Sequence, residues 1–335
     1  MSGGKRAGSL PGPGPAARPE PQRRAVLATV ALLALALPPA AKAQGALDLA
    51  SLRERALELV NESRRGEGLD ALTSGEHLDE AAQVHAEDML RRNYYAHASP
   101  EGETVRDRYL EADGSDWELV AENIARCTGC PWPPNAARIE ELHDGWMNSP
   151  GHRANILGQG LLRFGFGIAG EDGGDLYAVQ TFAGPGVARG ADTPGGSEPI
   201  ADSQAPDLAL SRVNEARREA GVPELAASEA LTSAAEALVP EDLSGSGLEE
   251  LGDPFEALSN DEGRAWGRIA TLAGTCGGCG TRITRGDVEA YVSDWLSDTR
   301  YRDTLLDPEQ THMGLVVRAD GQGRKAALAL LGVAR

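Results

Sequence analysis

Two histidines and a glutamate in the first half of the sequence lie outside any regular apolar pattern. His97 precedes Ser-Pro, Glu122 lies in the stretch AENIA, and His152 follows Ser-Pro-Gly. Imidazole nitrogens are common ligands of divalent metals, and a carboxylate can orient such an imidazole through its second ring nitrogen. The same groups could carry out acid–base chemistry. Because 25 and 30 residues separate them, the spacing leaves metal binding, catalysis and a structural hydrogen-bond network all open.

Four cysteines form two pairs of identical spacing, Cys127 with Cys130 and Cys276 with Cys279. In an exported protein we expect disulfides, either within each pair or between the two pairs. The four sulfurs could instead hold one zinc ion together, although the two pairs lie much further apart than in the usual zinc motifs. A thioredoxin-like redox role is not favoured, because neither pair opens a helix after a strand.

Several short motifs follow one another in the first half of the chain: VN at 60–61, HASP at 97–100, AENIA at 121–125, WMNSPGHRANIL at 146–157, GFG at 165–167 and YAVQTF at 177–182. With these motifs the stretch from Leu52 to Gly184 resembles a bacterial CAP domain. That superfamily includes cysteine-rich secretory proteins, plant pathogenesis-related proteins and insect venom antigens. The order of so many motifs makes the resemblance specific.

The resemblance implies an α/β (α+β) fold, a three-layer α-β-α sandwich with a central antiparallel sheet. It also implies a wide cleft with two histidines and two acidic residues. By position, His97 and His152 match the cleft histidines and Glu122 matches the first acid. The second acid is missing, because Met-Asn-Ser follows Trp146 and Asp144 lies on the wrong side of it. The expected metal ligands are therefore His97 and His152 with Glu122 behind them, and zinc rather than calcium is the expected ion.

The pattern of the first half returns in the second. The cysteine pairs recur 149 residues apart, and the same offset relates Trp146 to Trp295. A constant offset between unlike features indicates an internal repeat. Residues 185–206 have almost no large apolar side chains, which is typical of an exposed linker. We therefore expect two tandem copies of one fold, at 48–184 and 207–335.

The second copy lacks the polar residues of the first. The offset of 149 places Tyr301 where His152 stands, and an alignment on Ile269 places Gly267 where Glu122 stands. The stretch near position 250, where the equivalent of the first cleft histidine is expected, has no histidine. We therefore predict a degenerate CAP-like domain with a structural or interaction role.

Apolar periodicity gives a coarse map of the first copy. His85 lies on the apolar stripe of the second expected helix and is predicted to be a core or boundary residue, and the two repeated tryptophans are predicted core anchors. The expected elements are helices near 52–63, 74–90, 104–110 and 135–149, and strands at 162–168 and 176–182.

The N-terminus and the charge point to an exported protein. Residues 1–43 run from basic through apolar to small residues, which is the layout of a signal peptide. The apolar run 25–37 is too short to span a bilayer comfortably, so no transmembrane span is expected after its removal. The chain has a net charge of −19, and about −24 without residues 1–43. Such a charge disfavours nucleic acid and anionic membranes as partners.

Three functions remain open for a secreted protein of this kind. We favour a non-catalytic extracellular binding module that takes a divalent cation, or a small apolar or glycan ligand, with a lipid or cell-envelope component as a further candidate partner. The second is a secreted, protease-like hydrolase, for which Ser99 and Ser149 are nucleophile candidates only by nearness in sequence. The third is a cell-envelope interaction protein whose degenerate copy is adhesive.

Overall fold

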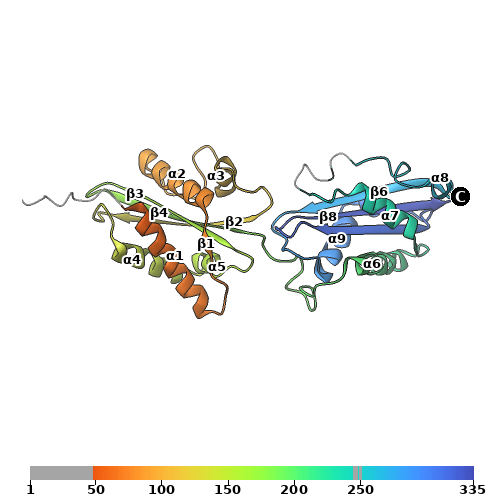
Figure 1. Cartoon of the computed structure of the whole chain (residues 1–335), viewed down its shortest axis with the longest axis horizontal. Coiled ribbons are helices and arrows are strands. Elements are labelled where there is room, and N and C mark those ends of the chain that lie inside the picture. Colours follow the sequence, from red (N-terminus) through yellow and green to blue (C-terminus); the bar gives the residue numbers. More distant parts are fainter. Residues whose placement is uncertain (1–47, 244–247, 249–250) are drawn as a thin grey trace, which may run out of the picture. The chain divides into compact units, whose positions relative to one another are not determined.

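The computed structural model of the chain describes residues 48–243, 248 and 251–335 (Figure 1). The signal peptide predicted at residues 1–43 lies outside these residues. In the described part, no helix combines the length and the apolar character that a membrane crossing requires.

The first copy alternates helices with strands. Its elements are α1 (Leu49–Gly66), β1 (Thr73–Ser74), α2 (Glu76–Arg92), α3 (Val105–Glu111), β2 (Leu119–Thr128), α4 (Ala136–Met147), α5 (Pro150–Ile156), β3 (Arg163–Gly170) and β4 (Asp175–Gly184). The strands form one sheet in the order β1-β3-β4-β2, in which β1 pairs with β3 in parallel and the other neighbours are antiparallel.

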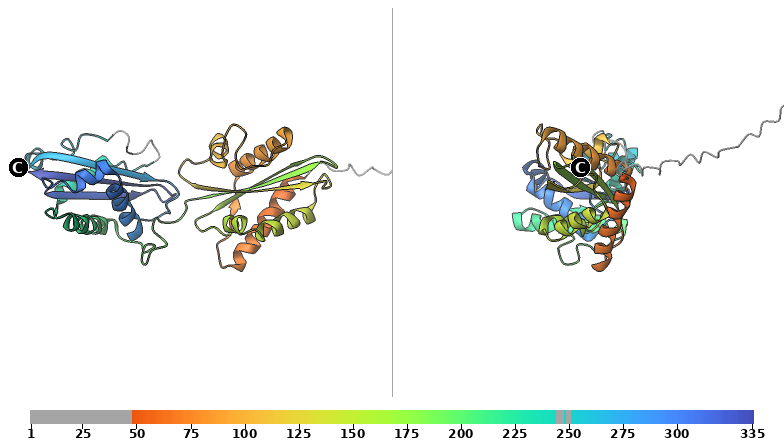
Figure 2. Two further views of the ribbon diagram at one scale, coloured as in Figure 1. Left: turned by 180° about the vertical axis from the view of Figure 1, so that it is seen from behind. Right: turned by 90° about the vertical axis from the view of Figure 1, so that its left-hand side faces the viewer.

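Helices cover both faces of this sheet. α2 and α3 lie on one face, and α1, α4 and α5 lie on the other (Figures 1 and 2). One apolar cluster packs α1, α4 and α5 against the sheet, and a second packs α2 against the opposite face. The predicted three-layer α-β-α sandwich is thus confirmed, with a mostly antiparallel central sheet.

Two local features explain the close fit of these layers. Gly167 lets α2 lie directly on the sheet, because a Cβ added there would come within 2.3 Å of the backbone of Ala82. On the other face Trp146 is buried, and its Nε1 donates a hydrogen bond of 3.0 Å to the carbonyl of Ile124. This tryptophan therefore ties α4 to β2, in agreement with its predicted role as a core anchor.

Strand β2 is the longest element of the first copy that the apolar pattern did not predict, and the short elements β1 and α5 were not predicted either. It is an outer strand of the sheet and pairs only with β4 among the described strands. Its first residue, Leu119, is exposed, whereas the polar Glu122 and Asn123 are buried. Because polar residues are buried and an apolar residue is exposed here, the alternation of apolar and polar residues that normally marks a strand is absent.

The second copy repeats this order of elements. They are η1 (Asp202–Gln204), α6 (Ala205–Ala220), β5 (Ala226–Ala227), α7 (Glu229–Leu238), α8 (Asn260–Gly263), β6 (Trp266–Cys276), α9 (Arg285–Ser297), α10 (Thr299–Leu305), β7 (His312–Ala319) and β8 (Lys325–Ala334). Its sheet has the order β5-β7-β8-β6, again with one parallel pair, between β5 and β7. Two copies of one fold are therefore present.

The strand register corrects one predicted equivalence. Glu122 pairs with Thr181 in the first sheet, and the matching pair in the second sheet is Thr271 with Leu330. The alignment that placed Gly267 at the position of Glu122 was therefore wrong. Its cause is an Ile-Ala dipeptide that occurs in both strands at different places in the register.

The segment between the copies is attached to the second of them. Most of residues 185–206 are exposed or half-buried. Even so, the amide of Ile200 donates to the carbonyl of Ile283 at 3.1 Å, and that of Gly286 donates to the carbonyl of Gly196 at 2.9 Å. This segment is therefore held by backbone hydrogen bonds, which its polar composition did not predict.

Candidate functional site

The carboxylate of Glu122 is the centre of the candidate site in the first copy. Its side chain is only 2% exposed. Oε1 lies 2.8 Å from Nδ1 of His97, and Oε2 accepts a hydrogen bond of 2.8 Å from Nη2 of Arg108. A buried carboxylate is costly unless charged or hydrogen-bonding partners compensate for its lost hydration. The two contacts provide such partners on both oxygens.

Arg108 fixes the loop that carries His97. It lies on α3, whose first turn is held by a capping box between Thr104 and Asp107. Besides Glu122, its guanidinium donates to the carbonyl of His97 at 3.0 Å and to that of Glu103 at 3.1 Å. The sequence reasoning missed this arginine, because a single arginine on a short helix carries no signal of burial.

His85 lies behind the same carboxylate. It is 1% exposed on α2, which confirms its prediction as a core or boundary residue. Its Nε2 lies 3.0 Å from the carbonyl of Ala96 and 3.8 Å from Oε1 of Glu122. The hydroxyl of Tyr94 lies 3.4 Å from Nδ1 of His85. The network therefore contains a third histidine that the sequence motifs did not reveal.

Two asparagines attach the segment of His152 to β2. Nδ2 of Asn123 donates to the carbonyl of His152 at 3.1 Å. Nδ2 of Asn155 lies 2.9 Å from the carbonyl of Glu122 and 2.9 Å from Oδ1 of Asn123. These bonds hold α5 beside the strand. His152 is thereby placed near enough to His97 for the charge of one imidazole to affect the other.

A shallow pocket opens beside this network. Its volume is about 330 Å³, and it is lined by His97, Glu122 and Asn155 together with small and apolar side chains from α3 and β2. The side chain of His97 is 59% exposed, whereas His152 is half-buried and is not part of the lining. The structure therefore joins His97 to Glu122 directly and places His152 next to them, outside the pocket.

The three histidines have different proton affinities. The hydrogen bond to Glu122 raises the pKa of His97 above its ordinary value of 6.5. Burial lowers the pKa of His85, and this outweighs the attraction of Glu122. Burial, with a smaller contribution from the charge of His97, lowers the pKa of His152. Near pH 6.5 His97 therefore favours the protonated form and the other two favour the neutral form.

A pH titration followed by NMR tests this order. We expect the imidazole of His97 to lose its proton above pH 6.5, and those of His85 and His152 to do so below it. In Glu122→Gln the raised pKa of His97 should be lost, because the anionic acceptor is gone. An unchanged pKa of His97 in that variant would show that Glu122 is not its cause.

The same shifts set the direction in which stability changes with pH. The raised pKa of His97 stabilises the fold fully below the pKa of an unfolded histidine, about 6.5, and this contribution is lost as the pH rises through the folded value. The lowered pKa of His85 acts in the opposite direction, so that its burial becomes unfavourable as the pH falls below about 6.5.

The residues present offer an open metal site at most. Among the described residues, no group of three or more His, Cys, Asp or Glu side chains is arranged to hold a metal ion. Both oxygens of Glu122 are engaged by His97 and Arg108, so this carboxylate can orient a ligand but is not itself a free donor. His97 and His152 remain as nitrogen donors, and water or a bound molecule would have to complete the coordination.

Among the described residues, those that line the pocket include no serine. Ser99 is buried, and its Oγ contacts Glu101 and the amide of Glu103. A serine and a histidine do contact each other elsewhere in the described part of the chain: Oγ of Ser63 on α1 lies 2.8 Å from Nε2 of His143 on α4. Neither residue lines the pocket.

The corresponding positions of the second copy carry neither a carboxylate nor an imidazole. Thr271 occupies the position of Glu122 in the strand register. Tyr301 lies on α10, at the position that His152 takes on α5. The candidate site is therefore confined to the first copy.

The cysteines form a disulfide within each pair. Cys127 bonds Cys130 and Cys276 bonds Cys279, with Cα–Cα distances of 5.8 and 6.1 Å. Each bond closes the end of an outer strand, β2 or β6. Of the arrangements left open by the sequence, pairing between the copies and a shared four-sulfur zinc site are both wrong, because every sulfur is already bonded to its neighbour in the sequence.

Comparison with known proteins agrees with this architecture. The family model described as "Cysteine-rich secretory protein family", CAP, matches residues 57–182 and 210–332. An uncharacterised Bacillus subtilis protein, YkwD, is 30% identical over 132 residues, which cover 39% of this chain and 47% of that protein. The chain spans less than half the length of the curated relatives it matches.

Solved structures share the same type of domain. An extracellular protein containing an SCP domain from Bacillus anthracis has 28% identity and a TM-score of 0.32, with 40% of each chain covered. The structure of Na-ASP-1 covers 87% of this chain and 91% of its own, with 11% identity and a TM-score of 0.37.

Proposed function

Because the chain belongs to the CAP family, with two copies of the family's domain, we propose that it is an extracellular binding module. Its first copy takes a divalent cation, zinc in the first instance, or a small ligand at His97 and His152. The observation that carries the proposal is the arrangement of His97, whose Nδ1 is bound to a buried carboxylate while its side chain stays exposed to the pocket.

The contact with Glu122 prepares His97 for coordination. A carboxylate at Nδ1 favours the tautomer that carries its proton there, which leaves the lone pair of Nε2 outward. Among the described residues, Nε2 of His97 has no hydrogen-bond partner. His152 supplies a second imidazole that burial keeps neutral at physiological pH, the form that binds metals. A bound zinc ion would supply a Lewis acid for anionic groups of a ligand.

The pocket itself suits a small ligand. Its volume of about 330 Å³ is at the lower end of the range for small-molecule sites, roughly 300–1,000 Å³. Ala98, Val105 and Val120 give its wall an apolar character, and Asn155 provides a polar group at the edge. This combination supports a small, partly apolar molecule or a sugar rather than a large lipid as the occupant.

Zinc titration by calorimetry tests the proposal. We expect the protein to bind one zinc ion, and His97→Ala or His152→Ala to weaken binding by about 100-fold, because only two imidazoles hold the metal. Glu122→Gln should weaken it by about 10-fold through the loss of the orienting carboxylate. Binding should tighten from pH 6 to 8 as His97, whose pKa is raised, loses its proton.

The matched control is His77→Ala, since His77 is an exposed histidine on α2 outside the pocket. This variant should bind zinc like the unaltered protein. Equal losses in His77→Ala and His152→Ala would mean adventitious surface binding. Undetectable zinc binding by a folded protein would leave the three residues as a hydrogen-bond network and refute the metal part of the proposal.

A further inference from the structure

A cavity in the second copy lies away from the histidine pocket. Its volume is about 710 Å³, more than twice that of the pocket beside His97. Residues of η1, α6, α7 and β7 line it. The walls are the two helices, and the floor is the margin of strand β7.

That margin is a strand edge without backbone partners beyond the first residues of β7, and it lies at the bottom of the cavity, where Leu315 and Val317 are 1% and 2% exposed. The short strand β5 covers only the beginning of β7, where the amide of Ser228 donates to the carbonyl of Met313 at 3.0 Å. Backbone groups of alternate residues point to the same side of a strand, so Leu315 and Val317 present their N–H and C=O groups to this edge. In the described part of the chain, no side chain or neighbouring segment is hydrogen-bonded to these groups.

The first copy closes the same edge with its own side chains. The amide of Phe166 donates to Oδ1 of Asp79 at 2.8 Å, and its carbonyl accepts from Nε of Arg53 at 3.0 Å. Gln83 does the same for Ile168, accepting from its amide and donating to its carbonyl, both at 3.1 Å. These side chains from α1 and α2, called the polar plug below, therefore satisfy the edge groups of Phe166 and Ile168.

The second copy has lost this plug. The side-chain oxygen of Asn61 accepts a hydrogen bond from the amide of Leu72, and that of Asn214 accepts one from the amide of Leu225. Because the two asparagines play the same role, the first helices of the copies align with an offset of 153 residues. With that offset, Pro206 stands at the position of Arg53, Thr232 at that of Asp79 and Glu236 at that of Gln83. Proline has no donor, threonine is too short, and a carboxylate cannot donate to a carbonyl.

The positions of the glycines support this equivalence. A Cβ added at Gly165 would come within 2.4 Å of the amide nitrogen of Asp79, and one added at Gly314 within 2.3 Å of that of Thr232. Both strands thus approach the second helix of their copy at the same residue. The open edge is therefore a consequence of three substitutions in otherwise matching surroundings.

The cavity is acidic. Carboxylates from η1, α6 and α7 line it, and Arg318 is the one basic residue in the lining, with its Nη1 bonded to the carbonyl of Val239. The acidic lining residues are Asp202, Asp207, Glu229 and Glu236. Lysine or arginine side chains of a partner would find complementary charges here.

We propose that the second copy binds an extended, basic peptide segment, which adds as a strand to the open edge of β7. Its backbone would pair with the N–H and C=O groups of Leu315 and Val317. Its lysine or arginine side chains would reach the carboxylates of the rim. Strand addition of this kind takes its affinity from main-chain hydrogen bonds and its specificity from the flanking side chains. The site is independent of His97 and of the function proposed for the first copy.

The probe for this site is an eight-residue peptide of alternating valine and lysine, titrated into the full chain by calorimetry. We expect saturable binding with one peptide per chain. N-methylation of alternate amides on the pairing side should weaken binding by about tenfold or more, because it removes the main-chain donors. A peptide with glutamate in place of lysine should not bind. Equal affinity of the N-methylated peptide would overturn the strand-addition proposal.

A variant that restores the plug of the first copy provides the decisive test. Pro206→Arg combined with Thr232→Asp and Glu236→Gln should abolish peptide binding while the circular dichroism spectrum and zinc binding stay unchanged. His97→Ala should bind the peptide like the unaltered protein. If the plugged variant binds the peptide with unchanged affinity, the proposal is wrong.

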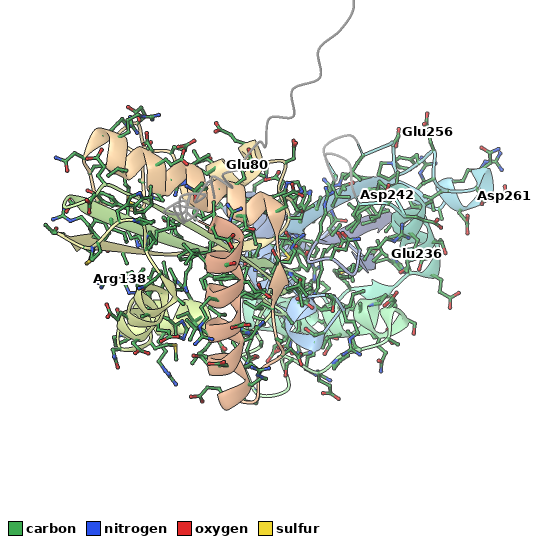
Figure 3. All side chains as sticks on the ribbon, turned by 60° about the vertical axis from the view of Figure 1, so that its left-hand side comes forward. Glu80, Arg138, Glu236, Asp242, Glu256 and Asp261 are labelled. Carbon is green, nitrogen blue, oxygen red and sulfur yellow. A yellow bond between two sulfur atoms is a disulfide. The ribbon has the colours of Figure 1, made fainter. Side chains whose placement is uncertain are left out.

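The charge contribution has a matched control on the same copy (Figure 3). Glu229→Gln with Glu236→Gln removes two charges from the cavity, whereas Glu256→Gln with Asp261→Asn removes two charges from exposed residues outside it. Only the first pair should weaken binding beyond about threefold at low salt. Equal losses would indicate general attraction to an acidic protein. If the protein forms dimers and the plugged variant does not, the edge binds another molecule of the same protein. That outcome would also overturn the proposal.

Discussion

Replacing Arg108 by leucine is expected to destabilise the first copy by about 3–5 kcal/mol, the range for breaking a buried ion pair. The side chains of Arg108 and Glu122 are each 2% exposed, so the variant leaves a carboxylate without its cationic partner in the interior. The bonds from the guanidinium to the carbonyls of His97 and Glu103 are lost as well. Urea denaturation of the two proteins measures the difference in the free energy of unfolding.

The neighbouring Arg106 supplies the control. It lies on the same helix, and its side chain is 45% exposed beside Asp116. Arg106→Leu should change the free energy of unfolding by no more than about 0.5 kcal/mol. The double variant Arg108→Leu, Glu122→Gln should recover part of the loss, because no unpaired charge remains. If Arg108→Leu unfolds at the same urea concentration as Arg106→Leu, the buried pair does not organise the site.

The second large effect is expected from Lys325→Leu in the second copy. Nζ of Lys325 contacts Oδ2 of Asp287, and both side chains are fully buried. The amide and hydroxyl of Thr284, the N-cap residue of α9, also donate to Oδ2 of Asp287, which forms a capping box with it. Removing the ammonium group leaves this carboxylate buried and uncompensated, at a cost of about 3–5 kcal/mol. The midpoint of urea denaturation of the second copy reports the loss.

The first copy shows that the fold can form without this buried ion pair. There the position of Lys325 is occupied by Leu176, and that of Asp287 by Arg138, whose side chain is 25% exposed. The double variant Lys325→Leu, Asp287→Asn should therefore regain most of the stability that Lys325→Leu loses. If the double variant is no more stable than Lys325→Leu, the loss of stability comes from the packing of the lysine side chain and not from its charge.

Local patterns of the sequence were sufficient to predict much of this protein. In the first copy, α1 to α4 and the strands β3 and β4 agree with apolar periodicity, which depends only on residues near one another in the chain, whereas α5 was not predicted. The repeat follows from a constant offset, and the contact between His97 and Glu122 agrees with the motifs that singled them out. The burial of Trp146 and Trp295 also agrees with their place on apolar helix faces. Apart from the repeat, which compares two distant segments, each of these inferences uses information that a single segment carries.

Tertiary structure alone decided how distant segments meet. Strand β2 was not predicted, because its polar residues are buried by their partners instead of by an apolar pattern. Arg108 and His85 come from two helices and meet only at Glu122, so neither helix shows their shared role. The pairing of each cysteine with its near neighbour was one of several open arrangements.

The unpaired edge of β7 is the clearest example of a feature that the sequence alone did not predict. Its cause is the loss of a plug whose parts lie on two helices, and its effect falls on a strand about 80 residues or more further along the chain. Pro206 and Thr232 are ordinary residues of their helices when each is considered locally. Only the packing of α6 and α7 against β7 shows that backbone N–H and C=O groups of the strand are left without partners in the described chain. Whether a backbone group has a hydrogen-bond partner depends on how distant segments pack in the folded protein.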